Sequence, residues 1–385
     1  MTDIRGGLIG GVTRRTLLRV GGALGAGIFV TACSKGGGSS DASLPMALPT
    51  GSALEDMMAT AKKEGAIVVY ISVNEQLFEN WVKPFTDKYG VKVHPVNTGG
   101  AAATYTRWTQ EWNAKQYQAD AVLLADPSAA VNVDKAGMVG EWIPAEGDKF
   151  DRNLVIKGKA YPLILNACPM TWNSARITAE EAANLITKDG LANYAYLADP
   201  RWKGRLAVLA PHGVPIFRAE WVRIVKKYGW ELLEGIAKNK PAIPSSSVAA
   251  SDQLATGEIN VLAFDPTTAS ALSIGRGAPV QYAWDDEAAV TAFDMIVANN
   301  APHPNAARLF QEWCTTQVNV KSLCDVLEAI PGRDDVKPDT KTSKLAWYQK
   351  LTQPKLIADW TTDPAFTSGS KDFVDKWAKT FNYQR

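Results

Sequence analysis

Two short runs of small polar residues have the composition of a receptor for oxyanions. Ser245-Ser246-Ser247 precedes a predicted helix that begins near Val248, and Thr98-Gly99-Gly100-Ala101 leads from a predicted strand into an alanine-rich helix. Hydroxyl groups and the N–H groups of a helix N-terminus together bind phosphate, phosphonate or carboxylate oxygens. The same residue types are also common helix N-caps, so Ser247 and Thr98 can instead have a purely structural role. The sequence alone leaves both interpretations open.

Further polar residues follow other predicted strands or lie in loops between predicted elements. In open α/β sheets, ligands bind beyond the carboxyl ends of the strands, so these positions are the natural candidates. A carboxylate such as Asp265 can hold the ammonium group of a ligand or simply cap its own turn. Besides the two runs above, the predicted ligand-binding residues are Ser72, Asn74, Glu75, Asp126, Ser128, Asn173, His212, Asp265 and Thr267.

Motifs of known catalytic and metal sites find no convincing match in the sequence. There is no Gly-x-Ser-x-Gly motif, no zinc-binding helix motif and no Cys-x-x-Cys pair. Ser368 and Lys371 have Ser-x-x-Lys spacing, but Lys341-Thr342-Ser343 precedes them, which reverses the order found in penicillin-binding enzymes. We therefore predict a protein that is not an enzyme and that uses no cofactor or metal. A lipid-anchored hydrolase is the remote alternative.

The N-terminus has the pattern of a bacterial lipoprotein signal. Arg14 and Arg15 precede an apolar run over 20–32, which is too short to span a bilayer, and Cys33 follows it. We predict that residues 1–32 form a twin-arginine signal peptide and that Cys33 becomes the lipidated first residue. Residues 33–52 are rich in Gly, Ser and Pro and predict a flexible tether. The alternative is an ordinary N-terminal anchor helix. The predicted location is periplasmic or extracytoplasmic, with the chain attached to a membrane through the lipid.

Composition narrows the class of protein further. A net charge of +1 gives no electrostatic reason to expect a nucleic-acid partner. The tryptophans fall mostly in helical patterns and are expected in the core. After Cys33, the three remaining cysteines are Cys168, Cys314 and Cys324, for which a Cys314–Cys324 disulfide and three buried free thiols both stay open. About 330 residues follow the tether, which suggests two domains.

Strands and helices alternate through the first half of the mature chain. Buried strands are predicted at 66–71, 91–96 and 121–125, with a helix over 74–89. This alternation predicts parallel βαβ units with right-handed crossovers. After Pro144, strands at 161–165 and 169–172 are expected to leave the first sheet. The remaining predicted elements are strands at 205–209, 259–264 and 292–297, helices at 215–228, 248–256, 304–313 and 320–327, and a helical tail over 341–385.

Five segments resemble the periplasmic solute-binding proteins of ABC importers, in the branch that contains ferric-iron, thiamine, polyamine and phosphonate binders. They occur in the expected order over nearly the whole mature chain. The segments are AKKEGAIVVYIS at 61–72, TWNSARI at 171–177, DPRWKGRL at 199–206, GEINVLA at 257–263 and APHPNAARLF at 301–310.

This resemblance implies an α/β, periplasmic-binding-protein-like (type II) fold of two lobes. Each lobe would be a mostly parallel sheet flanked by helices, with the ligand cleft at the hinge and the triple serine facing Thr98-Gly99-Gly100 across it. The predicted lobes comprise 53–143 with 287–335, and 144–286 with 336–385. The implied partners are a small-molecule solute and an inner-membrane ABC permease with its ATPase, and we expect a monomer.

The same resemblance limits the choice of ligand. Iron binders of this family carry two adjacent tyrosines after the strand that corresponds to 259–264, where this chain has Thr267-Thr268. Threonine offers no comparable anionic ligand for a hard trivalent cation, which argues against direct ferric binding. The leading prediction is an organic anion or zwitterion, such as a phosphonate or phosphate ester, captured by hinge closure. Ferric iron, polyamines and thiamine-type cations remain the alternatives.

Overall fold

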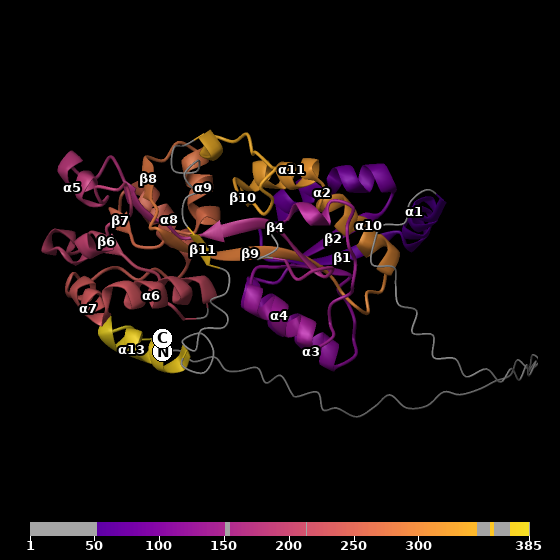
Figure 1. Cartoon of the computed structure of the whole chain (residues 1–385), viewed down its shortest axis with the longest axis horizontal. Helices are drawn as coiled ribbons and strands as arrows, with labels where there is room; N and C mark the ends of the chain where they lie inside the picture. The colour runs from indigo at the N-terminus through magenta and orange to yellow at the C-terminus, as the bar shows by residue number, and fades with distance from the viewer. Residues whose placement is uncertain (1–51, 151–154, 213, 345–354, 358–369, 385) are drawn as a thin grey trace, which may run out of the picture. The chain divides into compact units, whose positions relative to one another are not determined.

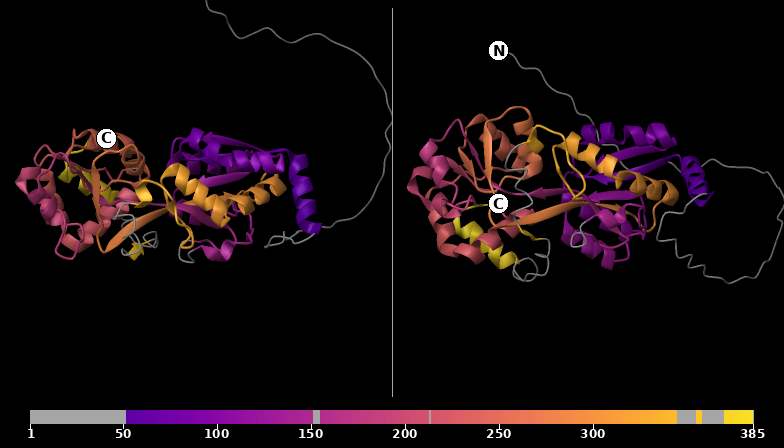
Figure 2. Two further views of the ribbon diagram at one scale, coloured as in Figure 1. Left: turned by 90° about the horizontal axis from the view of Figure 1, so that it is seen from above. Right: turned by 45° about the horizontal axis from the view of Figure 1, so that its top comes forward.

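Two β-sheets with helices packed against them make up the described part of the chain (Figures 1 and 2). The computed structural model describes residues 52–150, 155–212, 214–344, 355–357 and 370–384. All of these belong to one compact unit, Leu44–Arg385. The predicted signal peptide, Cys33 and all of the predicted tether except Ser52 lie outside the described residues.

The larger sheet has seven strands in the order β10-β4-β9-β3-β1-β2, with β11 paired to β9. β1 is parallel to β2 and β3, whereas β9 is antiparallel to β3 and β4. Its strands are β1 Ala66–Ile71, β2 Lys92–Asn97, β3 Ala121–Leu124, β4 Ala160–Ala167, β9 Glu287–Val297, β10 Ile330–Pro331 and β11 Lys355–Ile357.

The smaller sheet has four strands in the order β6-β7-β5-β8. β6 and β7 are parallel, and β5 is antiparallel to both β7 and β8. Its strands are β5 Met170–Asn173, β6 Leu206–Ala207, β7 Val261–Leu262 and β8 Val280–Ala283.

Helices α2, α4, α5 and α8 begin at residues whose side chains cap the first turn. In α2, which matches the helix predicted over 74–89, Asn74 is the N-cap and accepts a hydrogen bond from the amide of Leu77, and Gly90 ends the helix in the left-handed conformation. The α-helices are α1 Ser52–Glu64, α2 Glu75–Tyr89, α3 Ala101–Asn113, α4 Pro127–Lys135, α5 Ala179–Asn184, α6 Pro215–Tyr228, α7 Trp230–Lys238, α8 Ser247–Thr256, α9 Thr267–Gly275, α10 Pro304–Cys314, α11 Gln317–Leu327 and α13 Ser370–Thr380. Short 3-10 helices span Gly147–Lys149, Tyr194–Ala198, Pro200–Trp202 and Thr342–Lys344.

The antiparallel ladder of β4 and β9 connects the hydrophobic core under the larger sheet to the core around the smaller one. Along β9, Ala288, Ala289, Val290 and Ala292 contribute to the core of the smaller sheet, whereas Phe293 and Met295 belong to that of the larger sheet. β4 changes cores in the same way, with Leu163 in one and Ala167 in the other. The two strands therefore form the covalent and hydrogen-bonded link between the lobes (Figure 1).

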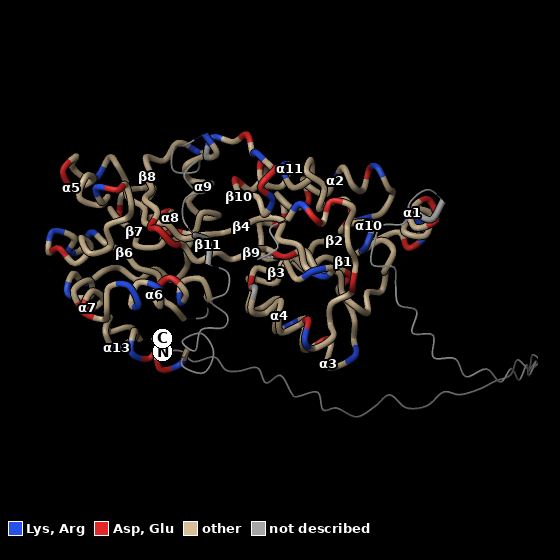
Figure 3. Tube along the Cα trace, viewed as in Figure 1, with Lys and Arg blue, Asp and Glu red and all other residues tan. Residues whose placement is uncertain are grey.

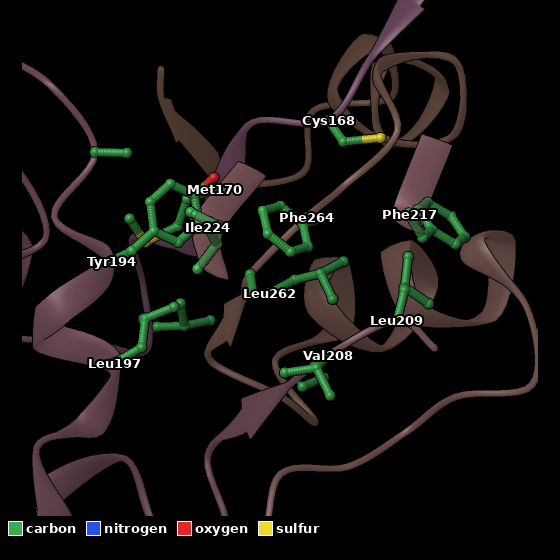
Figure 4. Packing of buried hydrophobic residues seen from close by; sticks show 14 of the residues in the cluster. Cys168, Met170, Tyr194, Leu197, Val208, Leu209, Phe217, Ile224, Leu262 and Phe264 are labelled. Atoms are coloured by element: carbon green, nitrogen blue, oxygen red, sulfur yellow. The ribbon is translucent and has the colours of Figure 1, made fainter. Parts of the chain in front are cut away.

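Aromatic side chains fill both cores. Around the smaller sheet, Phe264 packs against Tyr194 and Trp221, with ring centroids 5.4 Å and 4.8 Å apart. Figure 4 shows Phe264 among aliphatic neighbours, with Cys168 and Phe217 close by. In the other core, Trp81 packs against Phe310 and Trp313. Most tryptophans are buried, which confirms the expectation that they belong to the core.

Three details differ from the sequence predictions. Both sheets are mixed rather than mostly parallel, because β9 runs antiparallel to β3 and β4 in the larger sheet and β5 runs antiparallel to β7 and β8 in the smaller one. The strand predicted at 161–165 does not leave the first sheet but pairs with β9 within it, and only its end reaches the second core. The tail is not uniformly helical, since 355–357 form the strand β11. Residues 345–354 and 358–369 lie outside the described part of the chain.

The described thiols are free, and charge is spread evenly. Cys168, Cys314 and Cys324 are buried and unbridged, which decides between the two alternatives left open by the sequence.

Figure 3 shows acidic and basic residues interspersed along the trace, in keeping with the net charge of +1. No helix in the described ranges combines the length and the apolar character needed to cross a membrane.

Replacing Trp81 by Ala tests how strongly the core of the larger sheet depends on its aromatic cluster. Trp81 is 2% exposed, and its Nε1 donates to the carbonyl of Asn319 at 3.0 Å. We expect a loss of about 3–5 kcal/mol in the free energy of unfolding, measured by urea denaturation. Val318→Ala is the control, because Val318 is 73% exposed and its truncation should change stability by less than about 0.5 kcal/mol. Equal effects of the two substitutions would contradict the packing described here.

Candidate functional site

A cavity of about 560 Å³ lies where strand ends and helix starts from both sheets meet. From the larger sheet it is lined by Ser72, Gly99 to Ala103, Ala125, Asn166, Thr291 and Phe293. From the smaller sheet it is lined by Leu209, Ala210, His212, Val214 to Phe217, Pro244 to Ser247, Pro266 and Thr268, and Tyr383 completes the wall. Its volume is typical of a site for a small organic molecule.

Helix α3 presents an open N-terminus to this cavity. Its N-cap is Gly100, which supplies no side-chain hydrogen bond to the first turn. Gly99 and Gly100 have φ values of 87° and 130°, and a Cβ atom at either position would meet nothing within 4 Å. The two glycines therefore allow the chain to turn sharply and leave the first N–H groups of the helix accessible to a ligand. Thr98 is not the cap, because its Oγ1 donates to the carbonyl of Ile71 and contacts Thr104.

Three more helices, α6, α8 and α9, begin at the cavity. Helix α6 starts with Pro215, and its N-cap residue Val214 provides no side-chain hydrogen bond. Helix α8 is capped by Ser246, whose Oγ accepts from the amide of Ala249 at 3.1 Å. The serine hydroxyl can still donate to a ligand while it accepts this bond. The partial positive charges of the helix N-termini therefore converge on the cavity from both lobes.

The floor of the cavity is the β4–β9 ladder. Asn166 of β4 lies opposite Thr291 of β9 in the register of the two strands. The Oδ1 of Asn166 accepts hydrogen bonds from the Oγ1 of Thr267 at 3.0 Å and from the amide of Thr268 at 3.2 Å. Thr267 is thereby buried beneath the floor, where it fixes the orientation of Asn166.

One wall of the cavity is aromatic. His212 packs on Tyr383 with ring centroids 5.2 Å apart, and both rings contact the buried Trp377. The neighbouring loop is held by Trp221, whose Nε1 donates to the carbonyl of Leu209 at 2.8 Å. This wall offers a flat surface that packs against carbon and leaves the oxygen-binding groups to the helix starts.

No Asp, Glu, Lys or Arg is among the described residues that line the cavity. Arg218, one turn into α6, and Asp126, the N-cap of α4, directly follow the lining residues Phe217 and Ala125 in the chain. Burial lowers the pKa of Arg218, and the negative charge of Asp126 partly opposes this shift. The electrostatic potential in the cavity thus comes mainly from backbone dipoles. In addition, the negative charge of Asp126 in one lobe attracts the positive charge of Arg218 in the other.

Comparison with known proteins assigns the chain to a protein family. The family model described as bacterial extracellular solute-binding protein matches residues 67–318. The chain belongs to this family. No curated protein sequence matches the chain at a significant level.

Solved structures share the fold of this solute-binding protein at low sequence identity. The substrate-binding protein of an ABC transporter from Agrobacterium tumefaciens has a TM-score of 0.67 and 16% identity, and the match covers 82% of this chain and 94% of that one. Iron-bound HitA from Pseudomonas aeruginosa has a TM-score of 0.65 and 18% identity over 81% of this chain and 99% of the other. AfuA from Actinobacillus pleuropneumoniae, solved with fructose-6-phosphate, has a TM-score of 0.64 and 18% identity over 83% and 99%. The chain therefore has the two-lobed fold of type II periplasmic binding proteins.

Half of the predicted ligand-binding residues line the cavity of this solute-binding protein. The structure brings together residues that are up to 175 positions apart in the chain, as Ser72 and Ser247 show. The predicted residues at the cavity are Ser72, Gly99, Gly100, Ala101, His212, Ser245, Ser246 and Ser247.

The structure places the other predicted residues outside the cavity lining, where most of them stabilise the fold. Asn74 caps α2, with Glu75 exposed beside it, and Asp126 accepts from the backbone and side chain of Ser128 at the start of α4. Thr98 and Thr267 make the internal bonds described above. Asn173 ties the end of β5 to α8, because its Nδ2 donates to the carbonyl of Leu254 at 2.8 Å. Asp265 accepts from Thr171 and Ser251 within the core.

Sequence reasoning missed Asn166 and Thr291 of the floor and Tyr383 of the aromatic wall. Asn166 lies near the end of β4 and Thr291 within β9, and the only signal for either is a polar residue in a mainly apolar strand. Tyr383 reaches the cavity from the far end of the chain, and no local pattern marks it. The rule that ligands bind at strand ends finds loop residues, but it overlooks a strand that passes through the site.

The described residues do not form a metal centre. Among them, no three His, Cys, Asp or Glu side chains lie close enough together to hold a metal ion. Thr268 lines the cavity, and the hydroxyl of Thr267 donates to Asn166. Because a threonine hydroxyl is neutral, neither residue offers an anionic oxygen. The donor set present here does not fit a hard trivalent cation.

Two buried carboxyl groups lie close to the cavity without lining it. Burial raises the pKa of Asp265 to about 7, against the lowering effect of hydrogen bonds from Ser251, Thr171 and Ser270. Burial also raises the pKa of Asp294 to about 8, and the negative charge of Asp126 adds to the shift. Within the described residues the Oδ1 of Asp294 has no hydrogen-bond partner. Burial thus shifts both groups toward the neutral form in the folded protein.

Replacing Asp294 by Asn should change how stability depends on pH. The folded pKa lies above the unfolded value near 4, so the contribution of Asp294 to stability is fully present below about pH 4. It is lost as the pH rises through the folded value of about 8. We expect Asp294→Asn to match the wild type at pH 4 and to exceed its free energy of unfolding by at least about 2 kcal/mol at pH 8.5.

The measurement is urea denaturation at both pH values. Asp148→Asn is the control, because Asp148 has an exposed side chain and should leave the pH profile unchanged. An Asp294→Asn profile parallel to that of the wild type would show that the carboxyl is ionised in the folded protein without cost.

Proposed function

We propose that this chain is the substrate-binding component of an ABC importer and that it captures an organic oxyanion, a phosphonate or phosphate ester, for delivery to a membrane permease. One observation supports this most directly: helix N-termini from both lobes converge on a cavity whose described lining holds no charged side chain. Binding of a ligand without chemical change agrees with the lack of a convincing catalytic motif in the sequence. Export, lipidation at Cys33 and a monomeric state remain predictions.

The charge of the site favours anions over cations. Open helix N-termini at α3 and α6 place partial positive charge where no Asp or Glu of the described lining could offset it. A polyamine or a thiamine-type cation would lose its hydration here without gaining a counter-ion, which is costly. An oxyanion instead gains N–H and hydroxyl donors, including those of Ser245, Ser246 and Ser247.

Closure of the two lobes follows from the placement of these donors. Helix α3 belongs to the larger-sheet lobe, whereas α6 and α8 belong to the other, so an anion held by both sets bridges the lobes. A ligand that binds the closed form better than the open form shifts the population toward closure. The attraction between Arg218 and Asp126 acts in the same direction. The closed, loaded form is then the species that a permease recognises.

Replacing Ser245, Ser246 and Ser247 by Ala should weaken binding. The probe is the phosphonate or phosphate ester that gives the largest thermal shift in a screen of the wild type, since binding to the folded state raises the melting temperature. Each lost buried hydrogen bond costs about 1 kcal/mol, so we expect the triple variant to bind about 10- to 100-fold more weakly by calorimetry.

The matched control for the serine variant is Thr178→Ala. Thr178 caps α5 as Ser246 caps α8, so both changes remove an N-cap, but Thr178 is not among the residues that line the cavity. Its loss should cost about 1 kcal/mol of stability and leave the affinity unchanged. Unaltered affinity in a folded triple-serine variant would remove these serines from the site.

Ferric citrate provides the test of the iron alternative. HitA, which shares the fold, was solved with iron bound, yet this cavity presents Thr268 and Tyr383 and no group of metal-ligating side chains among the described residues. We expect no visible charge-transfer band when ferric citrate is added to the purified protein. A stable band, accompanied by a thermal shift that phosphonates and phosphate esters fail to produce, would replace the oxyanion with ferric iron.

A further inference from the structure

The floor of the cavity carries polar groups that an oxyanion at the helix starts would not use. Thr291 is 6% exposed, and its Oγ1 is buried without a hydrogen-bond partner among the described residues. The Oγ of Ser72, at the end of β1, is in the same condition. A buried hydroxyl without a partner costs free energy, and such groups in native proteins call for an explanation. Both residues line the cavity, so a ligand atom is the natural partner.

Asn166 adds a directed donor beside Thr291. Its Oδ1 is occupied by Thr267 and Thr268, and this fixes which way the amide group faces. No described residue accepts a hydrogen bond from its Nδ2. Because Asn166 and Thr291 are direct partners in the antiparallel ladder, side chains at these positions lie within reach of one ligand group. Asn166 and Thr291 of the floor and Ser72 at the end of β1 thus supply the cavity with one amide donor and two hydroxyls that each donate or accept.

Such a set of groups fits a hydroxylated and uncharged part of a ligand. A ligand hydroxyl both donates and accepts, which matches the amide and the two hydroxyls. An ammonium or a second carboxylate would lie here without a counter-ion, because no charged side chain lines the cavity within the described residues. The volume of about 560 Å³ also leaves room for a tail beyond a phosphate group.

We propose that Ser72, Asn166 and Thr291 form a subsite for the neutral, hydroxylated tail of an organic phosphate or phosphonate whose head lies at the starts of α3 and α6. This proposal rests on the proposed function and specifies its ligand. A 120° rotation about χ1 moves the Oγ1 of Thr291 to another staggered position, so the hydroxyl can turn toward a ligand without a change of backbone. The zwitterionic ligands that the sequence leaves open are disfavoured at this subsite.

Calorimetry with four probes that share a phosphate group tests the subsite. The probes are inorganic phosphate, propyl phosphate, phosphoethanolamine and glycerol 3-phosphate, measured at pH 8 with the wild-type protein. We expect glycerol 3-phosphate to bind at least about 10-fold more tightly than propyl phosphate or phosphoethanolamine, because it alone carries neutral hydroxyls. Tighter binding of phosphoethanolamine, or equal binding of the three esters, would overturn the subsite and leave the oxyanion site standing.

Two variants assign the preference to the floor. Thr291→Val keeps the shape of the side chain and removes its hydroxyl, and Ser72→Ala does the same with a smaller change. Each should weaken glycerol 3-phosphate about 5- to 10-fold and leave propyl phosphate within twofold. Thr60→Val, at an exposed position of α1, is the control and should change neither affinity.

The outcomes separate the two proposals. An equal loss for glycerol 3-phosphate and propyl phosphate in Thr291→Val would show a structural role for the residue and overturn the subsite. If none of the four probes binds the folded wild type, the oxyanion function itself fails. Melting temperatures of the variants establish that each one is folded before its affinity is compared.

Discussion

The antiparallel pairing of β4 with β9 is the interaction on which the rest of the structure depends. It is the place where two hydrophobic cores are joined by strands that belong to both. The ladder hydrogen bonds hold the register, so Asn166 stays opposite Thr291, and the cavity keeps its floor whatever the two lobes do. A hinge made of paired strands bends with little loss of hydrogen bonding, because adjacent strands twist as a unit. The strands that form the hinge between the lobes therefore also carry Asn166 and Thr291, which line the cavity.

The site obtains its polarity from the backbone rather than from charged side chains. Under the proposed function, helix dipoles and small hydroxyls would bind the oxyanion without burying a cationic side chain, whose desolvation would be costly while the site is empty. The two carboxyls near the site, Asp265 and Asp294, have raised pKa values because they are buried, and this limits the negative charge close to an anion. Such an arrangement keeps the empty cavity stable and gives the ligand a favourable potential.

Much of the fold could be predicted from the sequence, and the reasons are local. The apolar run of β1, the capping pair Asn74 and Gly90, and the polar runs before α3 and α8 are each encoded within a few residues. The course of β4 could not be predicted, because its apolar pattern suits either sheet and only long-range pairing decides between them. The same limit explains Tyr383 and Thr291, which reach the cavity through tertiary structure. Asn173 and Asp265 were selected by position, but the hydrogen bonds they make within the fold were not visible in the pattern.

The helix starts that surround the cavity belong to separate loops, whereas the ladder beneath them is continuous. Each loop is short and independent, so evolution can alter one donor at a time and leave the bending machinery intact. Proteins derived from such a scaffold can change their ligand specificity and still be recognised by the same kind of permease. Because the helix starts vary independently of the β4–β9 ladder, the same fold can serve the uptake of different solutes.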